Sequence, residues 1–148
     1  MKVVVDTNII FSAILNSQSW IGQVLLKSDK SVRFYSPKYL QTEIFNHIEK
    51  IEKITKLPKN EIIELIEILY TRIQFLSEDF IPKEILIKAE ELTIDVDYDD
   101  AVFAALSLHL KAKLWTGDKK LISALLQKGF KKFVTLEELR NKIIKKHS

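Results

Sequence analysis

The chain opens with MKVVVDTNII (residues 1–10), in which a run of β-branched residues stops at an aspartate. The segment from Lys2 to Val5 has the pattern of a strand buried on both faces, because such strands are apolar throughout rather than alternating. A helix is expected to follow over residues 9–15. The opening therefore predicts a β-α unit whose strand lies inside a sheet and ends at the carboxylate of Asp6.

The rest of the chain repeats this alternation of short apolar runs and longer segments with helical periodicity. This order favours an α/β fold with a parallel sheet that is covered by helices on both faces. Gly129 is expected to end one helix in a left-handed conformation. Strands are predicted over residues 32–35, 74–76, 113–116 and 133–134. Helices are predicted over residues 39–55, 61–73, 82–92, 101–111 and 121–128. Two more helices are expected to begin after Ser19 and after Thr135, and the second of these begins with a capping box between Thr135 and Glu138.

Composition limits the class of protein. The chain has 148 residues, of which 47% are hydrophobic, and this suits one domain over residues 1–148 and excludes wholesale disorder. The absence of Cys excludes disulfides, thiolate zinc sites and thiol nucleophiles. A net charge of +3 mildly favours nucleic acid as a partner. No signal peptide or membrane-spanning segment is evident, so we expect a cytoplasmic protein with no membrane partner.

Acidic residues follow two predicted strands and precede one strongly apolar helix. Asp6 follows the first strand, Asp118 follows the strand at 113–116, and four Asp lie within residues 95–100. Because the carboxyl ends of parallel strands share one edge of a sheet, these positions are expected to converge there, with Asp100 facing inward.

Each acidic position also has an ordinary structural explanation. Asp6 is eligible as the N-cap of the first helix, as are Thr7 and Asn8, and Asp118 is eligible as a turn or cap residue. The run at 95–100 has the composition of a solvated acidic loop. Glu43 lies within the predicted helix 39–55, where most glutamates simply face solvent.

The combination of acidic positions predicts a metal site. Clustered carboxylates raise one another's pKa unless a cation compensates them. Ligands that are all oxygen favour Mg²⁺, with Mn²⁺ as a substitute. The three His residues (His47, His109 and His147) are scattered, which excludes zinc sites of the HExxH or Cys/His type. Such an ion can orient water and stabilise the charge that develops on a phosphodiester.

Four motifs, in this order, resemble the PIN-domain family over almost the whole chain. They are residues 1–10, Ser36-Pro37 with Glu43, DYDDAVF (residues 97–103) and LWTGDKKL (residues 114–121). The resemblance implies a three-layer α/β/α sandwich with a central parallel sheet. It also implies a metal-dependent nuclease, most often an endoribonuclease, and many small single-domain members are VapC-type toxins.

The family's acidic quartet and its supporting polar residues have counterparts in this chain. The third acidic position is ambiguous between Asp97, Asp99 and Asp100. We choose Asp100 because Ala101 and Phe103 follow it with the family's helix spacing, and we keep Asp97 as the reserve metal ligand. The quartet implied by the resemblance is Asp6, Glu43, Asp100 and Asp118, and the supporting residues are Asn8 and Thr116.

The resemblance leads to a mechanistic hypothesis. Mg²⁺ would be held by Asp6, Asp100 and Asp118, directly or through water, while Glu43 positions or deprotonates the attacking water. In-line attack would then cleave RNA and leave 5′-phosphate and 3′-hydroxyl ends. Lys119 and Lys120, beside Asp118, are expected to bind flanking phosphates, although a solvated helix start explains them equally well.

The resemblance also implies partners, namely a small antitoxin protein and a second copy of the chain in a homodimer. Two alternatives keep the fold but change the role: a non-catalytic module that binds RNA or protein, and an RNA-processing nuclease without a toxin role. A receiver-type phosphoacceptor domain expects a second acid directly after the first strand, and a haloacid-type phosphatase expects an acid at position 8. The chain has Thr7 and Asn8 instead, so neither class fits.

Overall fold

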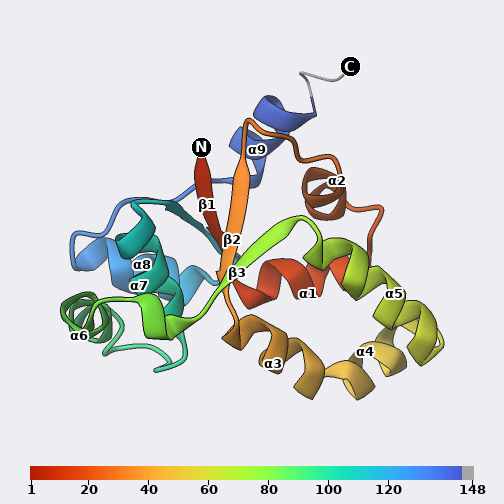
Figure 1. Ribbon diagram of the computed structural model, residues 1–148, viewed down its shortest axis with the longest axis horizontal. Coiled ribbons are helices and arrows are strands. Elements are labelled where there is room, and N and C mark those ends of the chain that lie inside the picture. The colour runs from red at the N-terminus through yellow and green to blue at the C-terminus, as the bar shows by residue number, and fades with distance from the viewer. Residues whose placement is uncertain (145–148) are drawn as a thin grey trace.

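A four-stranded parallel sheet forms the centre of the molecule (Figure 1). The structure, a computed structural model, describes residues 1–144. The strands lie side by side in the order β3-β2-β1-β4, with Val3 opposite both Phe34 and Lys113. The predicted parallel sheet is therefore confirmed. The strands are β1 (Lys2–Val5), β2 (Arg33–Pro37), β3 (Ile73–Leu76) and β4 (Lys113–Trp115).

Helices cover both faces of this sheet and complete three α/β/α layers, as predicted (Figure 1). One layer contains α1 (Thr7–Leu15), α2 (Trp20–Leu26), α3 (Tyr39–Asn46), α4 (Ile48–Thr55) and α5 (Lys59–Tyr70). The other contains α6 (Lys83–Leu92), α7 (Asp100–Leu110) and α8 (Lys119–Gln127). A 3₁₀ turn, η1 (Glu78–Phe80), precedes α6, and α9 (Leu136–Ile143) packs on α2 beside the amino ends of the strands.

Burial explains why the sheet has this place in the fold. Val3, Val4 and Val5 are fully buried, as expected for a strand between two helical layers. Residues 101–107 of α7 are all buried, and the small side chains among them let this helix contact β1 and β2 closely. Within residues 1–144 no single helix is long and apolar enough to cross a membrane; α1 and α2 reach that length and composition only as a pair bent by 105°.

The predicted helix over residues 39–55 is two helices, α3 and α4, which meet at His47. In a continuous helix the Glu43 carbonyl would accept a hydrogen bond from the His47 backbone N–H. Here the imidazole Nδ1 of His47 lies 2.7 Å from that carbonyl, and the backbone N–H donates to the carbonyl of Ile44 instead, at 3.1 Å. The imidazole thus takes the place of the backbone donor at the Glu43 carbonyl where α3 ends.

Two other predicted boundaries are wrong. The helix predicted over residues 61–73 ends at Tyr70, because Ile73 pairs with Phe34 as the first residue of β3. Residues 133–134 do not form a strand; Phe133 makes only a single β-bridge, to Leu114. Gly129 is confirmed as a left-handed residue, with φ +88°. The sequence also predicts that Lys145 and Lys146 supply positive charge at the C-terminal end of the last helix, and these two residues lie outside the described residues.

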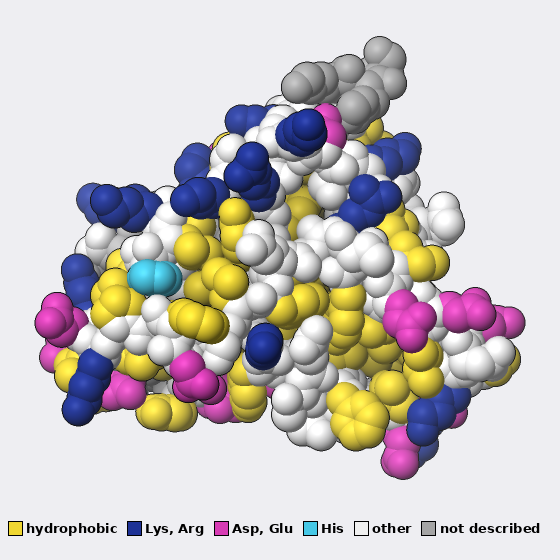
Figure 2. Space-filling view, viewed as in Figure 1, with side chains coloured by type: hydrophobic (Ala, Val, Ile, Leu, Met, Phe, Trp, Pro, Cys, Tyr) yellow, Lys and Arg dark blue, Asp and Glu magenta, His cyan; other side chains and the backbone are white. Residues whose placement is uncertain are grey.

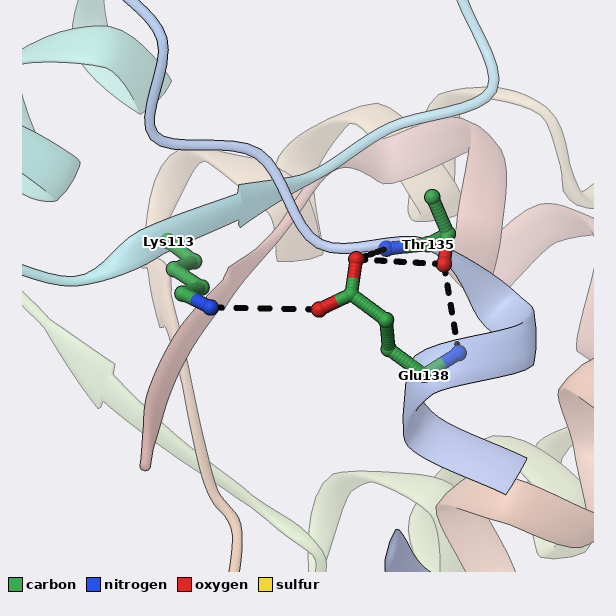
Figure 3. A network of polar contacts seen from close by, with 3 residues as sticks. All are labelled: Lys113, Thr135 and Glu138. Carbon is green, nitrogen blue, oxygen red and sulfur yellow. Dashed lines mark hydrogen bonds and ion pairs between the residues drawn. The ribbon is translucent and has the colours of Figure 1, made fainter. Parts of the chain in front are cut away.

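The predicted capping box at the start of α9 is confirmed (Figure 3). The Thr135 hydroxyl accepts from the Glu138 N–H at 3.2 Å, and the Glu138 carboxylate accepts from the Thr135 N–H at 3.4 Å. The other carboxylate oxygen of Glu138 lies 3.8 Å from Lys113 Nζ. In the face shown in Figure 2, Lys and Arg side chains gather toward the end that holds the amino ends of the strands, and most Asp and Glu lie toward the other end.

Candidate active site

Asp6 lies at the carboxyl end of β1 and is almost completely buried. Its Oδ1 accepts from the Thr7 N–H at 2.8 Å, so it is also the N-cap of α1. Its Oδ2 accepts from the Thr116 hydroxyl at 2.6 Å and from the Asn8 amide at 3.2 Å. Burial raises the pKa of Asp6 above its ordinary value of 3.8, while these hydrogen bonds lower it. Asp6 therefore caps α1 with one carboxylate oxygen, and its other oxygen accepts from two polar side chains at the carboxyl edge of the sheet.

Asp118 faces Asp6 from the end of β4. Its Oδ1 caps α8 by accepting from the N–H groups of Lys120 and Leu121, at 3.0 and 3.2 Å. Its own N–H donates to the Thr116 hydroxyl oxygen at 3.1 Å, and this ties it to the group that holds Asp6. The negative charge of Asp118 raises the pKa of Asp6 further, which places the two carboxylates in one electrostatic environment.

Glu43 extends from α3 toward the end of β1. Its Oε1 accepts a hydrogen bond from the Thr7 hydroxyl at 2.6 Å, across 36 residues of sequence. Burial and the charges of Asp6 and Asp99 raise the pKa of Glu43, whereas the Thr7 hydrogen bond and the nearby His47 lower it. Glu43 is therefore held in the site rather than free in solvent.

Asp100 is the first residue of α7 and is half-buried. No described residue donates a hydrogen bond to its carboxylate. Burial and the charges of Asp6, Asp118, Asp97 and Glu43 raise the pKa of Asp100 to about 7. Asp97 and Asp99 are exposed; Asp97 accepts from the Asp99 N–H at 3.1 Å, and Asp99 interacts with the Tyr39 hydroxyl.

The four acids of the predicted quartet line one cleft of about 290 Å³ at the carboxyl edge of the sheet. The two ion pairs found among the described residues, Lys113–Glu138 and Lys128–Asp95, do not involve them. Burial and mutual repulsion raise the pKa of three of the four: Asp6, Glu43 and Asp100. The cleft thus concentrates four acidic groups, none of which forms an ion pair with a described cationic side chain.

The donor chemistry of this cleft fits a hard divalent cation. Its acidic wall offers only carboxylate oxygens, supported by the hydroxyls of Thr7 and Thr116 and the amide of Asn8. Within residues 1–144, no three acidic or His side chains are yet arranged to hold one ion. The cleft therefore supplies suitable ligands and uncompensated charge, but its side chains do not form a closed cage.

Some predicted site residues lie elsewhere. Lys119 and Lys120 are exposed at the start of α8 and do not line the cleft. Asp97 is outside it as well, although its charge reaches Asp100. Asn8 and Thr116 hold Asp6, and the Asn8 carbonyl oxygen also accepts from the Gly117 N–H at 3.0 Å. The side chains of the two supporting residues thus contact the acids, whereas Lys120 contacts Asp118 only through its backbone N–H and neither lysine forms an ion pair with the four acids.

Sequence reasoning missed five residues that line the cleft, namely Thr7, Phe11, Ile44, His47 and Lys50. Thr7 bonds Glu43, and Phe11, His47 and Lys50 line the cleft beyond the carboxylates. His47 carried a weak signal, because it lies one helical turn from Glu43. The other missed residues carried no signal in the sequence, because their positions in the cleft depend on how α1 packs against α3 and α4.

Comparison with known proteins agrees with this architecture. A family model described as PIN domain matches residues 4–143. No functionally curated protein matches the chain significantly in sequence.

Solved structures resemble the fold over nearly its full length. The crystal structure of PAE2754 from Pyrobaculum aerophilum has a TM-score of 0.68 at 12% identity, covering 98% of this chain and 90% of that one. VapBC-1 from nontypeable Haemophilus influenzae has a TM-score of 0.65 at 17% identity, with 93% and 99% covered. VapBC2 from Rickettsia felis, bound to a DNA fragment from its promoter, has a TM-score of 0.62 at 17% identity, with 91% and 97% covered. At these identities the likeness establishes the shared fold.

Proposed function

The chain belongs to the PIN-domain family, and from that premise we propose that it is a metal-dependent endoribonuclease that hydrolyses RNA phosphodiester bonds. PIN domains are generally nucleases, and this chain retains an acid at each of the four matching positions. One observation carries the proposal: Asp6, Glu43, Asp100 and Asp118 share a cleft in which no described cationic group forms an ion pair with them.

Asp6, Asp100 and Asp118 would hold Mg²⁺, or Mn²⁺ in its place. When bound, the ion supplies positive charge that acidifies water and stabilises the phosphate during attack. The chain fixes Asp6 through Thr116, Asn8 and the Thr7 N–H, so its carboxylate enters the site with little freedom to rotate. This fixed orientation lowers the cost of assembling the site for each substrate.

Glu43 would orient the attacking water and accept its proton. The Thr7 hydroxyl holds one oxygen of Glu43, and the raised pKa of this carboxyl suits a general base. Water oxygen attacks phosphorus, the bond from phosphorus to the 3′ oxygen breaks, and that oxygen takes a proton from solvent. The products are a 5′-phosphate and a 3′-hydroxyl. Lys119 and Lys120, exposed beside Asp118, would bind flanking phosphates of the strand.

The test is cleavage of end-labelled RNA by the purified chain with Mg²⁺ or Mn²⁺, with and without a chelator. The matched variant is Asp6→Asn, which retains a residue type that caps helices well. Cutting that requires the metal and disappears in Asp6→Asn supports the proposal. Equal cutting by wild type and variant would identify a contaminating nuclease instead. Circular dichroism of both proteins controls for folding.

We further propose that the chain is the toxin of a toxin-antitoxin pair, acts in the cytoplasm as a homodimer and is neutralised by a small antitoxin. Two solved structures with the same fold are VapBC proteins, and this supports the role. Expression of the wild type should arrest growth of a host, and expression of Asp6→Asn should not. Relief of the arrest by the product of a small adjacent gene would support the pairing, whereas normal growth of cells that express active enzyme would favour an RNA-processing role.

A further inference from the structure

The cleft that holds the four acids continues into a region of different chemistry. Beyond Glu43 its lining changes to Phe11, Ile44, His47 and Lys50. Ile44 is buried, Phe11 is half-buried, and His47 and Lys50 are exposed. An aromatic ring, an aliphatic wall and a cation thus lie next to the acidic cluster, in the same cleft.

Phe11 contacts both polar side chains of this region. The rings of Phe11 and His47 meet edge to face, with centroids 6.2 Å apart and planes at 81°. The Lys50 ammonium lies over the Phe11 ring, 5.7 Å from its centroid. The break between α3 and α4 at His47 sets the direction of α4, the helix that carries Lys50. The helix break at His47, which the sequence did not predict, therefore determines where Lys50 lies relative to Phe11.

His47 is fixed in one orientation with one nitrogen available. Its Nδ1 lies 2.7 Å from the Glu43 carbonyl oxygen. Because a carbonyl can only accept, Nδ1 must carry the proton of this bond. The second nitrogen, Nε2, forms no hydrogen bond with any described residue and is left for a ligand. The same bond couples His47 to the backbone of a proposed catalytic residue.

We infer that Phe11, His47 and Lys50 form a nucleotide subsite, which binds the base and phosphate of the RNA nucleotide next to the one being cleaved. This inference rests on the proposed function, since it concerns the same substrate. Aromatic faces stack on any base, which suits a strand bound with little sequence preference. Lys50 is the only Lys or Arg among the described residues that line the cleft, so it is the group there that attracts a phosphate past the four acids.

Binding and cleavage are measured separately. Fluorescence anisotropy of a labelled single-stranded RNA oligonucleotide, in chelator and over a series of salt concentrations, reports binding without turnover. Phe11→Leu keeps an apolar side chain and removes the stacking face; we expect the Kd to rise about 5- to 100-fold. Lys50→Gln should reduce the slope of log K against log salt by about 0.7, the value for one phosphate contact on a single strand.

The matched control is Lys53→Gln. Lys53 is exposed on the same helix, α4, and does not line the cleft, so its removal makes the same change in net charge. If Lys50→Gln and Lys53→Gln weaken binding equally, or if the wild type does not bind the oligonucleotide, the subsite is overturned. A DNA oligonucleotide of the same sequence should show the same dependence on Phe11 and Lys50, because neither contact uses the 2′-hydroxyl.

The two proposals fail in different ways. Loss of binding in Phe11→Leu and Lys50→Gln, in a protein that cleaves nothing with Mg²⁺, would support the subsite and remove the nuclease. Metal-dependent cleavage by the wild type, with both variants binding as the wild type does, would remove the subsite and support the nuclease. Circular dichroism controls for the fold of Phe11→Leu, and the exposed Lys50 tests the subsite even where that variant is unstable.

Discussion

Two helix starts in this molecule use carboxylates for opposite purposes. At α9, both oxygens of Glu138 have partners, since one accepts from Thr135 and the other lies 3.8 Å from Lys113 Nζ (Figure 3). At α7, Asp100 also lies in the first turn, where the helix dipole favours a negative charge. Yet no described residue donates a hydrogen bond to Asp100, and three other acids share its cleft.

The two helix starts differ in their effect on stability: the carboxylate at α9 stabilises the fold, whereas the carboxylates of the cleft destabilise it. The α9 start satisfies backbone groups that would otherwise lack partners, so it contributes to stability. The cleft keeps desolvated, mutually repelling charges together, which costs stability. A folded protein retains such an arrangement where function needs it. Neutralising a side chain should therefore have opposite effects on stability in the two regions.

Asp100→Asn should give the largest effect. RNA cleavage should fall by more than about 100-fold, because loss of outer partners of a metal site alone costs about 10- to 100-fold. In chelator at neutral pH, the free energy of unfolding should instead rise by about 1 kcal/mol or more, since a repelled charge is gone. Cleavage kinetics and urea unfolding measure the two quantities. An Asn variant that is both less stable and fully active would contradict the comparison.

The stability of the wild type should depend on pH in the direction opposite to that of an ordinary paired carboxylate. The folded-state pKa of Asp100 is raised to about 7 from 3.8, and those of Asp6 and Glu43 are raised as well. At a pH between the ordinary pKa of 3.8 and the raised pKa of about 7, Asp100 binds more protons in the folded protein than in the unfolded chain. The free energy of unfolding therefore falls as the pH rises through this range.

For Asp100 we expect a loss of roughly 2 kcal/mol between pH 4 and pH 7 in chelator, after allowance for partial exposure. Urea unfolding at a series of pH values measures this loss. Asp100→Asn should flatten the profile, and Mg²⁺ should oppose the loss in the wild type by pairing with the ionised acids. A wild-type profile that rises over this range would show that the four acids do not repel one another as the geometry requires.

Sequence predicted the parts of this site that lie at the ends of strands. Asp6 follows β1 directly, Asp118 follows β4 after Thr116 and Gly117, and Asp100 opens an apolar helix, so the order of the elements places these acids at one edge of the sheet. The break at His47 escaped prediction because a single imidazole competes for one carbonyl, and apolar periodicity carries no trace of that competition. Helix packing, which no short motif encodes, brings Lys50 over Phe11.

Thr7→Val should give a moderate effect on activity. Valine has nearly the shape of threonine but cannot donate to Glu43, so the 2.6 Å hydrogen bond that positions this carboxylate is lost. We expect kcat to fall about 10-fold with little change in KM, as for a supporting residue in an active site. Thr7→Ser retains the hydroxyl and should restore most of the rate. If serine and valine impair cleavage equally, Thr7 does not act through its hydrogen bond.

Thr135→Ala tests the other side of the comparison and should give the smallest effect. Removing a threonine cap costs about 1 kcal/mol, because alanine lacks the hydroxyl that accepts from the Glu138 N–H, although its backbone N–H can still donate to the Glu138 carboxylate. Cleavage at a temperature where the variant is folded should be unchanged, because Thr135 does not line the cleft. Glu138→Gln should cost less than about 0.5 kcal/mol, since its pair with Lys113 is exposed and glutamine still accepts from Thr135. Thermal unfolding ranks the two variants. If either one were more stable than the wild type, the carboxylate at α9 would resemble those of the cleft, and the distinction between the two helix starts would fail.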